Sequence, residues 1–223
     1  MFTGLFWPAV LAAVVDWLAV WHGWERVRWV TKPGTLILLI AWFSSVGGWA
    51  GPLALFGVGL VFSLLGDVFL MLPAQFFLAG VGAFFAAHVF YIAGFSSQPL
   101  SLRAEAALPV LAVAGVYVLV NGRIQAGIRE QKQTQMSLPV ALYAGVISLM
   151  LLMALSTFAR PAWGQFPALL VSLGAGLFFI SDSILAFNRF AKPVRFGDMM
   201  VMVTYHLGQF CIAAGVLAQF TGK

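Results

Sequence analysis

The segment Ser63–Leu72 reads SLLGDVFLML and lies inside a long apolar run of the sequence. It carries one carboxylate, Asp67, although no Lys or Arg occurs between Lys32 and Arg103. A helix that crosses a bilayer needs about 20 mostly apolar residues, and this run is long enough. We therefore interpret the segment as part of a membrane-spanning helix whose carboxyl group needs an explanation of its own.

The composition of the whole chain is typical of a membrane protein. Of its 223 residues, 62% are hydrophobic and 9% are charged, whereas about 25% of residues are charged in soluble domains. The chain therefore has too few polar side chains to cover a water-facing surface. Its net charge of +5 comes from basic residues between apolar runs, as in membrane loops, so we expect no nucleic-acid partner. The single cysteine, Cys211, cannot form an intramolecular disulfide.

Apolar runs separated by short breaks with charge, Pro or Gly predict eight membrane spans within one domain, residues 1–223. The expected ranges are 4–22, 33–50, 52–72, 75–95, 105–121, 136–157, 164–187 and 197–220. No stretch is left over for a soluble domain. The predicted fold is therefore all-α, a polytopic membrane protein built as a single bundle of eight transmembrane helices. The first run lacks a basic n-region and a cleavage site, so we expect it to be retained.

The charges of the loops predict the orientation of the bundle. Nine basic residues fall in the breaks on one side, namely Arg26, Arg28, Lys32, Arg123, Arg129, Lys132, Arg189, Lys192 and Arg195. Three fall on the other side, namely Arg103, Arg160 and Lys223. Because basic loops face the cytoplasm, we expect both termini to be non-cytoplasmic. The expected location is a bacterial inner membrane.

A second carboxylate, Asp182, repeats the setting of Asp67. Its context FISDSIL aligns without gaps with LLGDVFL, 115 residues earlier. Both carboxylates are expected near the cytoplasmic ends of spans that run in the same direction, and the alignment suggests a 4+4 parallel internal repeat. A purely structural role is one interpretation, in which each carboxylate forms hydrogen bonds at a helix end near the membrane interface. Ionisable residues inside spans are costly and usually functional, and the shared depth and context of the two favour function.

Other polar residues share helix faces within the expected spans. One face, spaced at i+3 and i+4, comprises Gly80, Phe84, His88, Tyr91 and Phe95. In the last span Tyr205 and Gln209 share a face, with His206 beside it. These side chains either line a site or form hydrogen bonds between helices.

Three further charged residues lie near the expected interfaces. Lys32 precedes Pro33 at the expected start of the second span, where it either binds substrate or acts as a snorkelling or topology lysine. Asp16 and Asp198 are single carboxylates near interfaces, and we interpret both as structural.

Five segments in a fixed order carry a family resemblance. They are TKP (31–33), GDVFLML (66–72), FLAGVGAFFAAHVFY (77–91), GAGLFFISDSILAFNRF (174–190) and YHLGQFCIAAG (205–215). Together they resemble the YhhN-like family of eight-span membrane proteins, which includes the lysoplasmalogenases. The resemblance covers about residues 30 to 215 and departs at His206, where a second tyrosine is expected.

The resemblance implies hydrolysis of the vinyl-ether bond of a lysoplasmalogen. The substrate would be a lysophospholipid, lysoplasmenyl-ethanolamine or -choline, and the products a fatty aldehyde and glycerophospho-ethanolamine or -choline. We expect no cofactor and no bound metal.

This reaction needs an acid and a carboxylate close together. Protonation of the outer alkene carbon gives an oxocarbenium ion, water adds to it, and the resulting hemiacetal decomposes. Desolvation raises the pKa of a carboxyl group, and a second carboxylate separates the two pKa values. Glycosidases use paired carboxylates against a similar transition state. We therefore expect Asp67 and Asp182 to be catalytic and to share one cavity. The residues expected to bind substrate there are Lys32, His88, Tyr91, Tyr205 and Gln209.

Two other function classes stay open. A proton-coupled lipid or small-molecule transporter would also use intramembrane Asp residues in repeated halves, although Gly66 and Ser181 are expected near helix ends rather than at mid-span. A metal-dependent membrane lipid hydrolase would use the two Asp residues with His88 or His206, but no His pair at i, i+4 is present. The sequence contains no P-loop, GxSxG, HExxH or CxxC motif.

Overall fold

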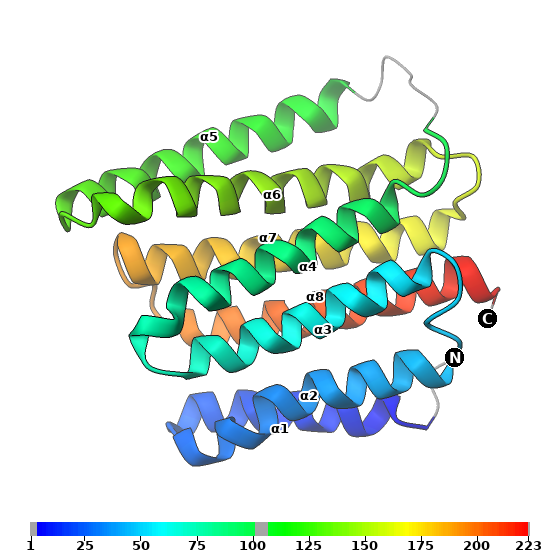
Figure 1. The fold of residues 1–223 in the computed structure, drawn as a ribbon, viewed down its shortest axis with the longest axis horizontal. Helices are drawn as coiled ribbons and strands as arrows, with labels where there is room; N and C mark the ends of the chain where they lie inside the picture. Colours follow the sequence, from blue (N-terminus) through cyan, green and yellow to red (C-terminus); the bar gives the residue numbers. More distant parts are fainter. Residues whose placement is uncertain (1–3, 101–106, 223) are drawn as a thin grey trace.

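The computed structural model describes residues 4–100 and 107–222, which form eight α-helices packed side by side in one bundle (Figure 1). The helices are α1 (Phe6–His22), α2 (Glu25–Ser45), α3 (Leu53–Met71), α4 (Phe77–Phe95), α5 (Ala107–Glu130), α6 (Ser137–Leu155), α7 (Gln165–Phe190) and α8 (Gly197–Thr221). Three short 3₁₀ turns accompany them, η1 (Ala74–Phe76), η3 (Thr134–Met136) and η4 (Ser156–Ala159). The predicted all-α class is confirmed.

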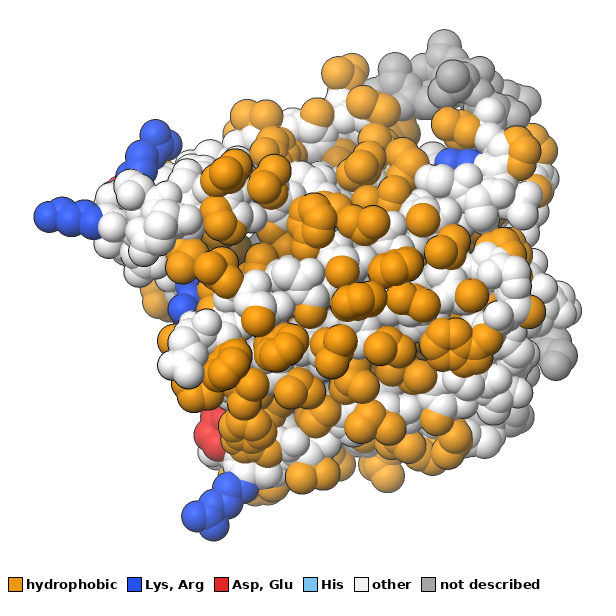
Figure 2. Space-filling model, viewed as in Figure 1, with side chains coloured by type: hydrophobic (Ala, Val, Ile, Leu, Met, Phe, Trp, Pro, Cys, Tyr) orange, Lys and Arg blue, Asp and Glu red, His pale blue; other side chains and the backbone are white. Residues whose placement is uncertain are grey.

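Six of the described helices, α3 to α8, are long and apolar enough to cross a membrane. The helix α1 is apolar but shorter, and α2 begins with the charged sequence ERVR. Figure 2 shows apolar side chains over the visible face of the molecule, as a lipid-facing surface requires. The chain is therefore a polytopic integral membrane protein.

The helix α2 begins earlier than predicted. It starts at Glu25 and ends at Ser45, so residues 25–32, which the predicted ranges leave to a loop, are helical, and the helix ends before residue 50. Its first turn contains an ion pair of 3.5 Å between Arg28 and Glu25, and Pro33 lies inside the helix. Charge and Pro misled the prediction, because a helix can project beyond the hydrocarbon while its basic side chains reach water, and membrane helices tolerate Pro.

The helix α5 also extends past its predicted end. It continues from residue 121 to Glu130, whereas the prediction placed a loop there. Ile124 and Ile128 repeat at i, i+4 and are buried with Val140 and Phe190 in a small apolar cluster. This apolar stripe was the helical signal, and the Gly between its members and the charged residues on either side concealed it.

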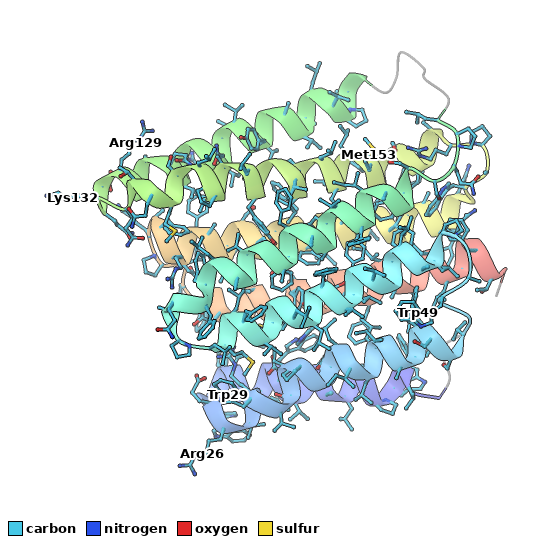
Figure 3. All side chains as sticks on the ribbon, viewed as in Figure 1. Arg26, Trp29, Trp49, Arg129, Lys132 and Met153 are labelled. Atoms are coloured by element: carbon cyan, nitrogen blue, oxygen red, sulfur yellow. The ribbon has the colours of Figure 1, made fainter. Side chains whose placement is uncertain are left out.

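The two ends of the bundle differ in charge. Arg26, Arg129 and Lys132 lie at one end, together with Trp29 (Figure 3). The helix α1 begins and α8 ends at the opposite end (Figure 1). The basic breaks therefore share one side and the outer ends of α1 and α8 share the other, as predicted. Which side faces the cytoplasm stays a prediction, and Arg103 and Lys223 lie outside the described residues.

Glycines bring α7 and α8 unusually close together. A Cβ placed at Gly174 would lie 2.7 Å from the carbonyl oxygen of Gly208 and 2.8 Å from the backbone nitrogen of Ile212. Both neighbours are backbone atoms, which cannot rotate away. Small residues are the usual means of close helix packing in membranes. This seam sets the relative position of α7, which carries Asp182, and α8, which carries Tyr205.

We expect Gly174→Ala to destabilise the protein by about 1–3 kcal/mol, since overpacking forces backbone shifts of that cost. The matched control is Gly176→Ala on the same helix, where a Cβ meets nothing within 4 Å. The control should be neutral or stabilising by up to about 1 kcal/mol, because Ala favours helix over Gly. Thermal unfolding in detergent measures both. Equal stability of the two variants would contradict the close approach.

Candidate active site

A cavity of about 210 Å³ lies between α2, α3, α4, α7 and α8. Four of the predicted site residues line it, Lys32, Asp67, Asp182 and Tyr205. The other lining residues are Arg28, Leu70, Phe84, Ser181, Leu185, Asp198, Val201 and Met202. Because Arg28 and Asp198 belong to the first turns of their helices, the cavity lies toward the basic end of the bundle. The structure thus brings both carboxyl groups to one cavity.

Asp67 is bound by a cation and a phenol. Its side chain is 1% exposed, and its Oδ1 lies 3.2 Å from the Nζ of Lys32. Its Oδ2 accepts a hydrogen bond of 2.7 Å from the hydroxyl of Tyr205. A charge-assisted contact and a second donor stabilise a carboxylate anion. Asp67 therefore has both a cationic partner and a neutral hydrogen-bond donor.

Lys32 differs from its predicted placement. We expected it at a helix N-terminus, but it lies inside α2 and is buried, with only 8% of its surface exposed. The helix begins at Glu25, so free backbone N–H groups of a first turn are not available beside Lys32. Its ammonium group is instead the partner of Asp67.

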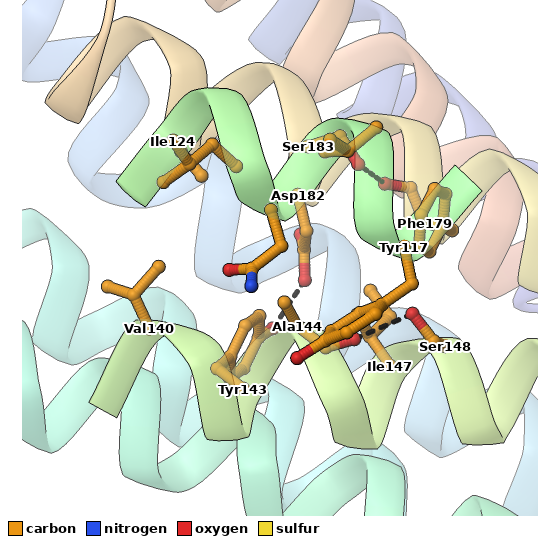
Figure 4. A pocket seen from close by; sticks show the side chains of 13 residues that line it. Tyr117, Ile124, Val140, Tyr143, Ala144, Ile147, Ser148, Phe179, Asp182 and Ser183 are labelled. Carbon is orange, nitrogen blue, oxygen red and sulfur yellow. Dashed lines mark hydrogen bonds between the residues drawn. The ribbon is translucent and has the colours of Figure 1, made fainter. Parts of the chain in front are cut away.

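Asp182 lies beside a phenol and an imidazole. The hydroxyl of Tyr143 on α6 donates a hydrogen bond to Oδ2 of Asp182 (Figure 4). The same hydroxyl lies 3.1 Å from Nε2 of His88 on α4, and that nitrogen is 3.6 Å from Asp182 Oδ2. Because the Tyr143 hydroxyl donates its hydrogen to Asp182, it accepts a hydrogen bond from His88, which is then the Nε2–H tautomer.

The contrast between the two carboxyl groups is the main electrostatic feature of the site. Among the described residues, the ion pairs include Lys32 with Asp67 but no Lys or Arg with Asp182. The side chain of Asp182 is 12% exposed and that of His88 is fully buried. One carboxyl thus has a cationic partner, and the other is joined through Tyr143 to His88.

Tyr91 and Gln209 do not reach the wall of this cavity. The hydroxyl of Tyr91 donates a hydrogen bond of 2.8 Å to Oε1 of Gln209, and both side chains are fully buried. Gln209 follows Tyr205 by one helical turn, so the pair lies deeper in the bundle. His206 accepts a hydrogen bond of 3.0 Å from Trp17, which fixes α1 against α8.

Sequence reasoning missed three residues of this region. Arg28 lines the cavity one turn before Lys32, and that i, i+4 spacing was a signal, but the segment had been assigned to a loop. Asp198 also lines the cavity, although we had interpreted it as structural. Tyr143 is a single tyrosine in an apolar span, and its sequence context contains no indication of its partner.

Metal ligands do not gather in the described part of the chain. Within residues 4–100 and 107–222, no group of three or more His, Cys, Asp or Glu side chains lies close enough to hold an ion.

Comparison with known proteins gives one family and several relatives. The YhhN family model matches residues 27–216. A protein of Escherichia coli O157:H7 described as "Uncharacterized membrane protein YhhN" is 30% identical over 214 residues, covering 93% of this chain and 97% of the relative. No solved structure matches.

Two human relatives have a named activity. "Lysoplasmalogenase TMEM86B" is 28% identical over 215 residues, covering 94% of this chain and 85% of the relative. "Lysoplasmalogenase TMEM86A" is 33% identical over 162 residues, covering 70% and 62% respectively.

Proposed function

The chain belongs to the YhhN family, and on that premise we propose that it hydrolyses the vinyl-ether bond of lysoplasmalogens. The substrates would be lysoplasmenyl-ethanolamine or -choline, cleaved to a fatty aldehyde and the glycerophospho-alcohol. The relatives named lysoplasmalogenase support the reaction. The observation that carries it is the pair of differently partnered carboxyl groups on one cavity, Asp67 and Asp182.

The partners of the two carboxyl groups suggest a division of roles. Asp182, bound by Tyr143 and close to His88, is the acid that protonates the outer alkene carbon. Asp67, held as an anion by Lys32, stabilises the oxocarbenium ion and orients the attacking water. The proton released by that water passes to Asp182 and restores the acid, and the hemiacetal then releases the aldehyde. General acids of this kind contribute about 10²–10⁴-fold.

The cations at the cavity suit the phosphate of the substrate. Lys32 is partly neutralised by Asp67, whereas Arg28 pairs with Glu25, whose side chain is 72% exposed. The Nε of Arg28 is buried without a hydrogen-bond partner. We assign the phosphate to Arg28, assisted by Lys32, at a glycerol's length from the bond that is cleaved.

The topology of the contacts supports the internal repeat. Asp67 on α3 takes partners from α2 and α8, namely Lys32 and Tyr205. Asp182 on α7 takes partners from α6 and α4, namely Tyr143 and His88. Exchanging the helices α1–α4 with α5–α8 converts one set into the other. We also propose that the cavity faces the cytoplasmic side of a bacterial inner membrane and that both termini lie on the other side.

The test of the function is incubation of the purified protein in detergent with lysoplasmenyl-ethanolamine, with and without a chelator. We expect aldehyde release that the chelator does not change. Loss of activity with chelator would instead favour a metal-dependent hydrolase. If the wild-type protein releases no aldehyde but moves lipid across liposome membranes, the result would favour a transporter.

We expect Tyr143→Phe to reduce kcat by about 10- to 100-fold, the effect of losing a hydrogen bond to a charged group. The variant keeps the ring and removes only the hydroxyl that joins His88 to Asp182. Tyr117→Phe, in the neighbouring cavity shown in Figure 4, is the matched control and should retain full activity. An unchanged kcat in Tyr143→Phe would refute the role.

A further inference from the structure

Asp182 lies at the junction of the active-site cavity with a second, apolar cavity. The second cavity has a volume of about 50 Å³ and lies between α3, α4, α6 and α7. Leu70, Phe84, Asp182 and Leu185 line both cavities, so the two spaces adjoin at the carboxyl group. We call the second one the side cavity.

The side cavity lies where α4 and α6 separate. The two helices contact each other at His88 and Tyr143, 3.1 Å apart, and again at Ser96 and Met153, 3.5 Å apart. Toward the basic end of the bundle they diverge (Figure 1). Figure 2 shows a hollow in the apolar face between them. The opening therefore faces lipid rather than water.

The walls of the side cavity are suited to hydrocarbon. Its apolar walls include Phe77 and Val81 of α4, Val140 of α6 and Ala186 of α7. Its polar lining consists of Asp182, which it shares with the active-site cavity, Tyr143 and the exposed Arg189. The guanidinium of Arg189 lies 4.2 Å from the centroid of the Phe77 ring.

The substrate needs such an exit. The active-site cavity of about 210 Å³ is smaller than the roughly 300–1,000 Å³ of typical ligand pockets, so it cannot hold a lysophospholipid with its whole chain. The alkene carbon that Asp182 protonates is also the first part of the hydrocarbon chain. The hydrocarbon chain must therefore extend out of the active-site cavity beside Asp182, where the side cavity begins.

We propose that the side cavity is the lateral portal through which the hydrocarbon chain of the lysophospholipid runs from Asp182 into the bilayer, between α4 and α6. This inference rests on the proposed function and adds where the lipid chain binds. The phosphate then lies at Arg28 and Lys32, and the chain lies among Phe77, Val81 and Val140. The substrate reaches the active site directly from the bilayer, and its hydrocarbon chain stays in the apolar region.

Val81→Trp tests the portal, because Val81 lines the side cavity and an indole there would take up space that the hydrocarbon needs. We expect the KM for a long-chain lysoplasmenyl-ethanolamine to rise at least about tenfold, the effect of keeping two or more methylene groups out of an apolar site. The KM for a short-chain analogue should stay within about twofold. Val89→Trp on the same helix is the matched control, since Val89 is 44% exposed and lines neither cavity. Unchanged chain-length dependence in Val81→Trp would overturn the portal.

A second measurement does not depend on turnover. A lysophosphatidylethanolamine with a diazirine in mid-chain is photo-crosslinked to the wild type and to both Trp variants, and the labelled peptides are mapped. We expect labelling of Phe77–Val81 or of the segment around Val140, lost in Val81→Trp and kept in Val89→Trp. Labelling elsewhere would overturn the portal. Labelling there without aldehyde release from lysoplasmalogen would sustain the portal and overturn the proposed function.

Discussion

Asp182→Asn is expected to lower kcat by about 10²–10⁴-fold, the usual contribution of a general acid. The amide has nearly the same shape as the carboxyl group and still accepts the hydrogen bond from Tyr143, so the fold should survive. It cannot deliver a proton to the alkene carbon. The measurement is the rate of aldehyde release under saturating lysoplasmenyl-ethanolamine, together with a thermal unfolding curve.

Asp198→Asn is the matched control for this loss. Asp198 also lines the cavity, but it is exposed and lies 3.4 Å from the amide of Asn188. Removing its charge should leave kcat within about twofold, because a screened surface charge contributes little. Full activity in Asp182→Asn would show that the carboxyl group is structural. Equal losses in both variants would show that the general charge of the cavity matters rather than an acid.

Lys32→Met is expected to destabilise the protein by about 3–5 kcal/mol, the effect of removing one partner of a buried ion pair. Methionine preserves the length of the stem but leaves Asp67 without its cation, in a position where the carboxyl side chain is 1% exposed. The double variant Lys32→Met, Asp67→Asn should recover most of this stability, because the amide needs no counter-ion. Thermal unfolding of the single and double variants in detergent gives the coupling between the two residues.

The control for the lysine is Lys192→Met, at an exposed position between α7 and α8, which should unfold like the wild type. A contrary result would be normal stability of Lys32→Met with only a raised KM. Lys32 would then act on the substrate's phosphate alone, and the ion pair with Asp67 would contribute nothing to folding.

The sequence predicted the helices better than their ends. Apolar runs located all eight helices, because each buries or exposes to lipid a long apolar surface. Charged first or last turns were lost, as at Glu25 of α2 and Glu130 of α5, since charge near an interface is compatible with both helix and loop. Asp67 and Asp182 were found because a carboxylate inside a membrane span is rare.

The partners of these carboxyl groups were harder to predict. The face of α4 that contains His88 follows from helical periodicity, and all five of its predicted residues are buried. The pairing of Lys32 with Asp67 and of Tyr143 with Asp182 depends on which helices are neighbours. Neighbour choice in an eight-helix bundle is decided by packing, such as the glycine seam of α7 and α8, and no local pattern encodes it.

The order in which the site's residues occur along the chain has a consequence for biosynthesis. A nascent protein enters the membrane from its N-terminus, so Lys32 and Asp67 meet when only three helices have been made. Their pairing neutralises α2 and α3 early, when a lone buried charge would oppose insertion. His88, Tyr143 and Asp182 come together only after α7, and Tyr205 arrives last, on α8. A chain that stops before its final helix therefore contains both carboxyl groups but lacks Tyr205, the hydrogen-bond donor to Asp67.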